Sequence, residues 1–224
     1  MTFVFDEEAG SEELQLKGES YKYLIKVRRH AVGDRVAFRQ PLTPELLHTY
    51  EIVEVDGRRA RLRLVESREY ELFHPRALHL GWCVIDPKSV EKVLPLLNEL
   101  GVAKITFVYA DRSQKNFTPD TARYERILQS SMQQCGRSRM MTFDTAPSVA
   151  AFLEKHPECI VFDFCERVFG EGASAAETVL IGPEGGFSEA ERSQMDEARV
   201  FRLDTPMVLR SETAAVAISS VLLL

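Results

Sequence analysis

Long apolar runs are missing from this sequence of 224 residues, although 45% of the residues are hydrophobic. No run approaches the roughly 18 consecutive apolar residues that a helix needs to span a bilayer, so we expect no membrane segment. The first ten residues, MTFVFDEEAG, are acidic and lack the basic start of a signal peptide, which favours a cytoplasmic protein.

Cysteine is also scarce. The four cysteines form no Cys-x-x-Cys pair, and no histidine stands at metal-ligand spacing from them. This pattern predicts free thiols in the reducing cytoplasm and no metal site. Two nucleotide-binding motifs are missing as well: no Gly-x-Gly-x-x-Gly follows an early strand, and no GxxxxGK(S/T) motif is present. These absences disfavour a Rossmann dinucleotide site and a phosphate-cradling NTPase loop.

The formal net charge of −6 argues against a nucleic-acid partner only if charge is evenly spread, and it is not. Residues 1–19 carry six acidic side chains and one basic, residues 20–75 carry eight acidic and 11 basic, and residues 112–139 carry two acidic and six basic. Two basic regions on an acidic background suit a protein that meets phosphate on one face. Ordinary solvated surface charge explains the same pattern, so charge alone leaves the choice open.

Residues 21–73 are predicted to form a small β domain. Four segments alternate or run apolar with β-branched residues, at 24–27, 35–38, 50–55 and 60–65. Asp56-Gly57 between the last two is a strong signal for a hairpin turn. A compact barrel follows, and we expect this domain to span residues 1–75.

From about residue 77, strands and helices are predicted to alternate. The strands are expected at 78–84, 105–109, 159–164 and 179–181, and the helices at 87–100, 119–135 and 148–155, with Gly101 ending the first helix. This rhythm predicts an α/β fold with a mainly parallel sheet and helices on both faces. We expect this second domain to span residues 76–224.

The most informative segment is IGPEGGF at residues 181–187. A short aliphatic strand precedes it, and Ser188 with Glu191 fits a capping box that starts a helix. Its glycines allow backbone shapes and a close ligand approach that side chains block. Because the turn has no lysine to hold a phosphate, it better suits an uncharged adenine or ribose held by backbone groups. A buried turn with a purely structural role is the alternative.

A second strand, turn and helix follow in LDTPMVLRSETAAVAISSVLLL, residues 203–224. The helix expected at 213–224 has almost no polar residue, so it is predicted to be buried under other elements or in a dimer interface. At roughly 18 Å it is too short to cross a membrane. Two turns that each close a strand and open a helix predict a ligand site near them.

Four segments resemble the signatures of the ribosomal RNA uracil-N3-methyltransferases, a branch of the SPOUT class, and they follow one another along the chain in the family's order. YLIKVRRH with VGD is similar to the family's N-terminal motif, and IGPEGGFSEAE with LRSETAAVAI is similar to its C-terminal signature. Asp111-Arg112-Ser113 and QQCGR at 133–137 resemble two motifs that lie between them. The family pattern has other residues where this sequence has Tyr23, Arg28 and Asp204.

The resemblance implies a PUA-like β-barrel that binds RNA at residues 1–75 and a SPOUT methyltransferase domain with a C-terminal trefoil knot at residues 76–224. It also implies a homodimer that holds S-adenosyl-L-methionine in the knot. The expected reaction is methylation of N3 of a uridine in small-subunit (16S) ribosomal RNA, with naked RNA or an assembled subunit as the substrate. The alternatives are a non-catalytic RNA-binding or ribosome-assembly factor, and a SPOUT methyltransferase that acts on another RNA site.

On this hypothesis the two turns and the end of the strand at 159–164 surround the cofactor. Backbone groups of the first turn, with Leu203 and Leu209, would hold adenine and ribose, and residues 211–213 would close the pocket. The residues expected to bind the cofactor are Phe162, Ile181, Gly182, Pro183, Glu184, Gly186, Leu203, Leu209, Ser211 and Thr213.

Three side chains are candidates for the catalytic chemistry. Arg210 is always protonated and can hydrogen-bond an oxyanion that develops at uracil O2 or O4. Glu212 can accept the N3 proton or orient Arg210, with a structural Arg210–Glu212 ion pair as the alternative. Arg112 follows a strand and is expected to reach the site or an RNA phosphate.

RNA contacts are expected from both domains. Because neighbours on a strand alternate faces, Lys26 and Arg28 would share one face, and Arg29 would point to the other. For Arg29 the alternative to RNA contact is a structural role between the two domains. The residues expected to contact RNA are Lys26, Arg28, Arg29, Ser113, Lys115 and Arg137.

Overall fold

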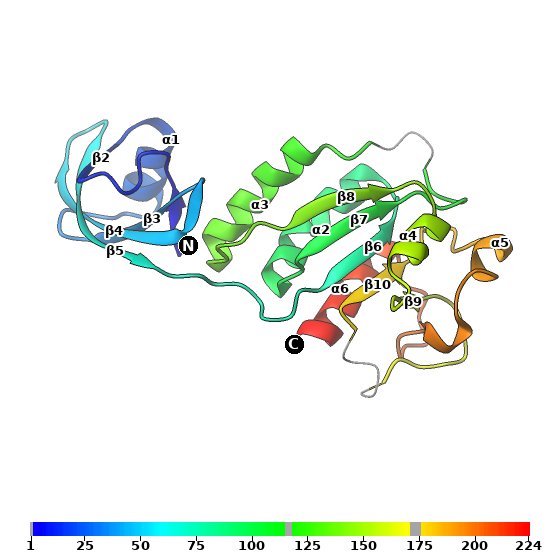
Figure 1. Cartoon of the computed structure of the whole chain (residues 1–224). Coiled ribbons are helices and arrows are strands. Elements are labelled where there is room, and N and C mark those ends of the chain that lie inside the picture. The colour runs from blue at the N-terminus through cyan, green and yellow to red at the C-terminus, as the bar shows by residue number, and fades with distance from the viewer. Residues whose placement is uncertain (1, 115–117, 171–175) are drawn as a thin grey trace. The chain divides into compact units, whose positions relative to one another are not determined.

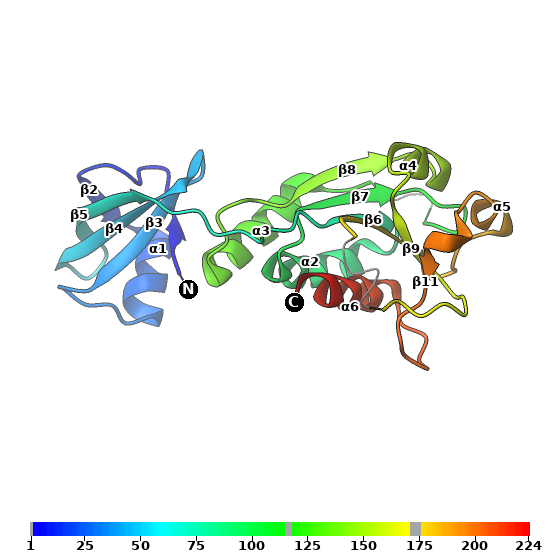
Figure 2. The same cartoon turned by 60° about the horizontal axis from the view of Figure 1, so that its bottom comes forward.

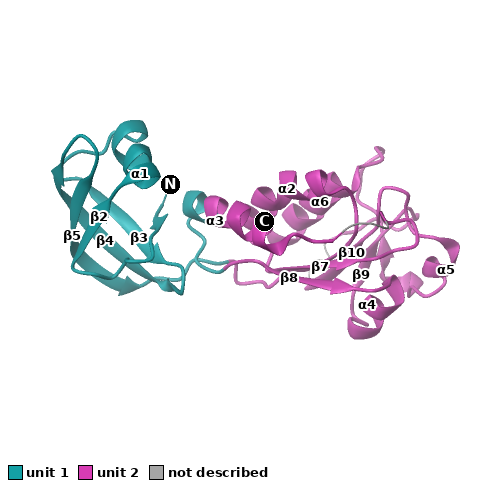
Figure 3. Ribbon diagram, turned by 90° about the horizontal axis from the view of Figure 1, so that it is seen from above, with its two compact units in different colours: residues 1–73, 132–139 teal, residues 74–131, 140–224 magenta. Residues whose placement is uncertain are grey.

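The computed structural model describes residues 2–114, 118–170 and 176–224, and it divides the chain into two compact units. Unit 1 comprises residues 1–73 and 132–139, and unit 2 comprises residues 74–131 and 140–224 (Figure 3). Lys115, one of the expected RNA contacts, lies outside the described residues. Within the described ranges no helix is long and apolar enough to cross a membrane.

Unit 1 is built on a five-stranded sheet in the order β1-β3-β4-β5-β2. The first strand pair, β1 with β3, is parallel, and the other neighbours are antiparallel. In the described part of the chain β1 and β2 are the edge strands, and each pairs with a neighbour on one side only. The sheet is therefore an open half-barrel rather than the compact barrel that the sequence predicts. Its strands are β1 (Val4–Phe5), β2 (Glu13–Leu16), β3 (Arg35–Gln40), β4 (Thr43–Val55) and β5 (Ala60–Glu69).

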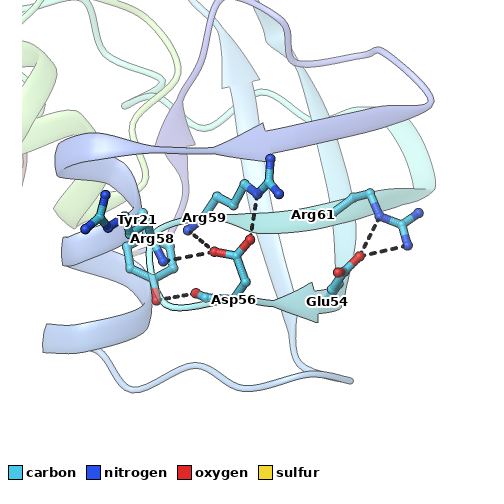
Figure 4. A network of polar contacts seen from close by, with 6 residues as sticks. All are labelled: Tyr21, Glu54, Asp56, Arg58, Arg59 and Arg61. Carbon is cyan, nitrogen blue, oxygen red and sulfur yellow. Dashed lines mark hydrogen bonds and ion pairs between the residues drawn. The ribbon is translucent and has the colours of Figure 1, made fainter.

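The hairpin predicted at Asp56-Gly57 is confirmed between β4 and β5 (Figure 4). The Asp56 carboxylate accepts hydrogen bonds from the backbone N–H groups of Arg58 and Arg59, both at 3.0 Å, and from Arg59 Nε at 2.6 Å. These donors lower the pKa of Asp56. The Asp56 carbonyl accepts from the hydroxyl of Tyr21 at 2.8 Å, which ties the turn to the helical segment before β3.

Residues 24–27 are helical, so the strand predicted there is wrong. The short helix α1 (Gly18–Tyr21) continues into a π-helix, η1 (Lys22–Val27). Tyr21 and Leu24 are buried three positions apart, which is helical spacing, and both pack into the core of unit 1. The strand-based alternation of faces expected for Lys26, Arg28 and Arg29 therefore does not apply, and the backbone turns at Arg29, whose φ is 61°.

Unit 1 also takes in the last turn of α3 (Thr121–Cys135) and the residues after it. Gln133 accepts three hydrogen bonds from the start of the chain. Phe5 N–H donates to its Oε1 at 3.0 Å, and Thr2 donates to its carbonyl through its N–H at 2.9 Å and through its hydroxyl at 3.3 Å. Ser138 N–H donates to the Leu72 carbonyl at 2.8 Å. The sequence pattern does not predict this return of residues 132–139 to unit 1.

Unit 2 is an α/β fold with a six-stranded parallel sheet in the order β11-β9-β10-β6-β7-β8 (Figure 1). The predicted α/β class with a parallel sheet is thereby confirmed. The strand β8 lies where the sequence analysis expects none. The strand β11 ends two residues before Leu203, the first residue of the segment in which the second strand is expected. The strands are β6 (His79–Cys83), β7 (Lys104–Val108), β8 (Thr142–Ala146), β9 (Ile160–Phe162), β10 (Thr178–Ile181) and β11 (Val200–Phe201).

Among the described residues of unit 2, the helices besides α3 are α2 (Pro87–Leu100), α4 (Val149–Lys155), α5 (Glu189–Arg192), η3 (Glu197–Arg199) and α6 (Ser211–Leu223). The predicted range of α2 is confirmed because local signals mark both of its ends. Asp86 accepts a hydrogen bond from Ser89 N–H at 3.0 Å at the start, and Gly101 ends the helix with a φ of 103°.

Both faces of the parallel sheet are buried, as expected for a sheet covered by helices. Val179 and Ile181 of β10 point into one core with α2, α3 and α6, and Leu180 points into the other core with α4. Figure 2 shows α2 and α6 side by side on one face and α4 on the other. On the α4 face, Gly81 makes room for Phe152, because a Cβ at this glycine would overlap the phenyl ring.

Two histidines lie together on the α4 face. His79 Nε2 is 2.7 Å from Thr106 Oγ1, and the His79 ring meets the ring of His156 edge-on, with centroids 4.8 Å apart. Burial, with the nearby His156 and Lys104, lowers the pKa of His79 to about 4. His79 is therefore neutral near pH 7.

The helix α6 is buried on one side in the single chain. Ala215, Ile218 and Leu222 pack into the core of unit 2. Val221, however, is 55% exposed, and Leu224 directly after the helix is 93% exposed. For this open side, the burial expected in a dimer interface stays a prediction.

Candidate functional site

A cavity of about 430 Å³ opens at the carboxyl ends of β9 and β10. This edge is where open α/β sheets bind ligands, and the volume falls within the roughly 300–1,000 Å³ of small-molecule sites. Its walls are the ends of these strands, the glycine turn after β10, the segment after β11 and the start of α6. The lining residues are Ser89, Phe162, Asp163, Phe164, Ile181, Gly182, Pro183, Glu184, Gly186, Arg202, Leu203, Thr205, Met207, Val208, Leu209, Arg210, Ser211, Glu212, Ala214 and Ile218.

The structure brings most of the expected site residues together here. Nine of the ten residues expected to hold the cofactor line the cavity, and so do Arg210 and Glu212. The tenth, Thr213, is exposed on α6 and is not among the described residues of the lining. Sequence reasoning missed Arg202, Met207 and Val208, because they lie in an irregular segment after a two-residue strand and carry no periodic signal.

The glycine turn forms the first wall of the cavity. Gly182 packs under Phe187, because a Cβ at Gly182 would lie 3.0 Å from the Phe187 ring. Gly186 has a φ of 67°, a left-handed conformation that favours glycine, and its N–H donates to the Pro183 carbonyl at 2.9 Å. The predicted capping box follows: Ser188 and Glu191 each accept a hydrogen bond from the backbone N–H of the other. Backbone geometry and the capping box together shape the turn and its continuation into the next helix.

Ser211 ties the two turns to each other. Its hydroxyl donates to the Gly182 carbonyl at 2.7 Å and accepts from Trp82 Nε1 at 2.9 Å. Both Trp82 and Ser211 are buried. The start of α6 is thereby held against the ends of β10 and β6.

Arg210 and Glu212 lie on the same wall but in different surroundings. The Arg210 side chain is 83% exposed, and that of Glu212 is 11% exposed. Arg210 Nη1 is 4.0 Å from Glu212 Oε1, too long for a direct hydrogen bond. Glu212 Oε2 is buried and has no hydrogen-bond partner among the described residues. A buried carboxylate oxygen without a partner is costly, so this atom marks a position where a ligand can donate.

Asp163, at the end of β9, is held in place by α5. Arg192 donates to it in bidentate fashion, with Nε 2.6 Å from Oδ2 and Nη2 3.2 Å from Oδ1. The Asp163 side chain is 5% exposed and lines the cavity. The same guanidinium lies beside Gly186, so α5 supports both the glycine turn and Asp163.

Arg112 contacts the glycine turn from outside the cavity. Its Nη1 donates to the Gly185 carbonyl at 2.8 Å. Neither residue is among the described residues of the lining. The third expected catalytic side chain is therefore at the site but turned to the back of its first wall.

The residues expected to contact RNA differ in how exposed their side chains are. Lys26, Arg28 and Arg29 are exposed in unit 1. Ser113 and Arg137 are buried, with 9% and 7% exposure. The Ser113 hydroxyl accepts from Ala110 N–H at 3.1 Å, and Arg137 Nε donates to the Arg139 carbonyl at 2.6 Å. In the described ranges no group of three His, Cys, Asp or Glu residues is placed to hold a metal ion.

Comparison with known families and proteins identifies the class. A family model described as an RNA methyltransferase domain matches residues 73–223, and the chain belongs to this family. More narrowly, it is 39% identical over 224 residues to the ribosomal RNA small subunit methyltransferase E of Helicobacter pylori, covering 99% of both chains. A protein of the same name from Aquifex aeolicus is 29% identical over 187 residues, which cover 79% of this chain and 81% of the relative.

Solved structures share the fold. One is a putative methyltransferase from Legionella pneumophila in complex with the bound cofactor SAM, with a TM-score of 0.74, 23% identity and coverage of 99% of this chain and 96% of that chain. Another is the ribosomal RNA small subunit methyltransferase E of Neisseria gonorrhoeae bound to S-adenosyl methionine, with a TM-score of 0.72, 21% identity and coverage of 98% and 95%. At these identities the likeness establishes the fold alone.

Proposed function

We propose that this enzyme transfers a methyl group from S-adenosyl-L-methionine to N3 of a uridine in small-subunit (16S) ribosomal RNA. The observation that carries the proposal is the cavity between the two turns, because nine of the ten residues expected to hold this cofactor line it. The names of the Helicobacter and Aquifex relatives support ribosomal RNA as the substrate. The Legionella and Neisseria structures, both with the cofactor bound, support S-adenosylmethionine.

The residues of the cavity fit this cofactor. Phe162, Ile181 and Leu203 supply apolar surface for an adenine ring, and the backbone of the glycine turn supplies hydrogen-bonding groups for its edge. The Glu212 carboxylate adds negative charge to the same cavity, which suits the positive sulfonium of the cofactor.

The chain's own residues would then position the base and move its proton. S-adenosylmethionine supplies an electrophilic methyl group when it is bound. Arg210, mostly exposed at the cavity wall, would donate to uracil O2 or O4 as negative charge develops on the base. Glu212 would accept the N3 proton through its unpaired oxygen. The 4.0 Å between Arg210 Nη1 and Glu212 Oε1 leaves both side chains able to turn to the substrate.

We further propose that residues 1–75 form a PUA-like RNA-binding domain and residues 76–224 a SPOUT domain with a C-terminal trefoil knot. The exposed Lys26, Arg28 and Arg29 support the first assignment, because phosphate contacts need accessible cations. The parallel sheet and the bond between Ser211 and Gly182, which holds the last helix against the end of β10, support the second. The open apolar side of α6 supports a homodimer.

The function is tested by mapping methyl groups in 16S ribosomal RNA from cells with and without this protein. The expected result is the loss of one N3-methyluridine when the protein is absent and its return when purified enzyme and S-adenosylmethionine are added. Calorimetry with S-adenosylhomocysteine separates the alternatives. A protein that binds RNA but releases no heat with this ligand would be an RNA-binding or assembly factor, and a methyl group at another position would redirect the proposal to a different site.

A further inference from the structure

We propose that Arg112 is a positioning residue of the cofactor site, which fixes the glycine turn from behind by holding the Gly185 carbonyl. The inference rests on the proposed function, because it assigns Arg112 to the cofactor wall rather than to the base or to RNA phosphate. The observation that carries it is the hydrogen bond of 2.8 Å from Arg112 Nη1 to the Gly185 oxygen.

The contact between Arg112 and Gly185 extends beyond one hydrogen bond. A Cβ at Gly185 would lie 3.3 Å from Arg112 Cβ and 3.4 Å from its Cδ. The aliphatic stem of the arginine therefore lies against the bare backbone of the glycine, and its guanidinium reaches the carbonyl of the same residue. A side chain at Gly185 would make this contact tighter than ordinary packing.

The loop that carries Arg112 is itself anchored to the far end of the glycine turn. Asp111 N–H donates to Glu191 Oε1 at 2.9 Å, and the Ser188 hydroxyl donates to Asp111 Oδ2 at 2.5 Å. Ser113, buried in the same loop, accepts from Ala110 N–H through its hydroxyl. Because Ser188 and Glu191 also form the capping box of α5, the loop and the turn share one set of bonds.

These bonds place Arg112 where it can shape the cavity without entering it. Gly182, Pro183 and Gly186 line the cavity, and the carbonyl that Arg112 holds lies between Pro183 and Gly186 in the chain. The next residue, Gly186, lies beside Arg192, which is fixed by Asp163. Two guanidinium groups thus lie against the turn. Loss of the Arg112 bond would let the backbone at 184–186 move and would spoil the hydrogen-bonding surface offered to the cofactor.

The test compares Arg112→Gln and Arg112→Lys with the unchanged enzyme. Calorimetry with S-adenosylhomocysteine is expected to give a dissociation constant about tenfold higher for Arg112→Gln, the loss of roughly one well-placed hydrogen bond. Arg112→Lys should recover part of this loss, because an ammonium can still donate to the carbonyl. The KM for RNA should change less than twofold in both variants.

Hydrogen exchange of the Gly186 amide, which donates to Pro183, gives a readout that needs no ligand. We expect faster exchange in Arg112→Gln than in the unchanged protein. The matched control is Arg167→Gln, which removes another arginine that donates to a backbone carbonyl, that of Ala198 at 2.7 Å. This control should leave both cofactor affinity and Gly186 exchange unchanged.

The outcomes separate this proposal from the proposed function. If the unchanged protein binds no S-adenosylhomocysteine, the function is wrong, and faster Gly186 exchange in Arg112→Gln still shows that Arg112 holds the turn. If Arg112→Gln binds the ligand normally and exchanges normally, Arg112 is not a positioning residue. If only the KM for RNA rises, Arg112 contacts RNA directly and the proposal is overturned.

Discussion

Single side chains decide the shape of this site where the parallel strands end. Ser211 is the clearest case, because one hydroxyl serves the Trp82 indole and the Gly182 carbonyl at once. The bond to Trp82 is buried and the bond to Gly182 is partly buried, and a buried polar group that loses its partner costs about 1–3 kcal/mol. The residue is therefore as important for stability as for binding.

Replacing Ser211 by Ala should lower the free energy of unfolding by about 1–3 kcal/mol, because the Trp82 N–H and the Gly182 carbonyl lose their shared partner. Urea titration followed by circular dichroism measures this change. Ser220→Ala is the matched control on the same helix, since the Ser220 hydroxyl bonds only to the Val216 carbonyl among the described residues. Equal effects of the two substitutions would show that the paired hydrogen bonds of Ser211 contribute no more to stability than one ordinary helix hydroxyl.

Glu212→Gln tests the proposed proton acceptor. The substitution keeps the shape of the side chain but removes its basicity, so single-turnover methylation should slow by about 100-fold or more. Stability should stay the same or rise, because the unpaired buried Oε2 is an electrostatic cost in the free protein. Glu189→Gln on the exposed start of α5 is the control and should methylate normally. A normal rate for Glu212→Gln would remove Glu212 from the mechanism.

At the scale of elements, local signals decided which predictions succeed. The range of α2 follows from the sequence because Asp86 and Gly101 mark its ends and the apolar spacing between them is helical. The segment around Leu24 misleads because a short β-branched run is equally compatible with a buried helix. There the π-helix is decided by packing of Tyr21 and Leu24 into the core of unit 1, which is a tertiary effect.

The α4 face of the sheet makes stability depend on pH through His79. Its pKa is about 4 in the folded protein and near 6.5 in the unfolded chain, so the unfolded chain takes up a proton first as pH falls. The free energy of unfolding should therefore fall between pH 6.5 and pH 4, by on the order of 3 kcal/mol from this group. Urea titrations across this range measure the slope.

His79→Gln is the matching variant, because an amide can still bond to Thr106 Oγ1 but does not titrate in this range. Its slope should be flatter but not zero, since burial also lowers the pKa of His156. An unchanged slope would assign the acid sensitivity to other groups.

At the scale of the whole molecule, the sequence indicates two regions of different rhythm but not how the chain is distributed between the two units. The return of residues 132–139 to unit 1 depends on bonds from Gln133 to the N-terminal segment, and no local pattern announces a contact across 128 positions. Most of the residues that the family motifs indicate for the cofactor lie together around one cavity, and their role there stays a prediction. The motifs do not indicate that Arg112 contacts the glycine turn from outside this cavity, because a motif gives proximity and not direction.

The open side of α6 gives the prediction at this scale. If the enzyme is a homodimer through this helix, Val221→Lys should place a charge in the interface and shift sedimentation from dimer to monomer at micromolar concentration. Leu42→Lys, at an 88% exposed position in unit 1, should leave the dimer intact. An unchanged protein that sediments as a monomer would refute the dimer outright.

The missing side chain at Gly81 affects more than the packing of one ring. Any side chain at that position would lift the Phe152 ring off the sheet, and this ring packs edge-on against His79, with centroids 5.6 Å apart. Water would then hydrate the imidazole, and its affinity for protons would approach that of the unfolded chain. The absence of a side chain at Gly81 thus keeps water away from the His79 imidazole, and the protein's stability in acid depends on a residue with no titrating atom.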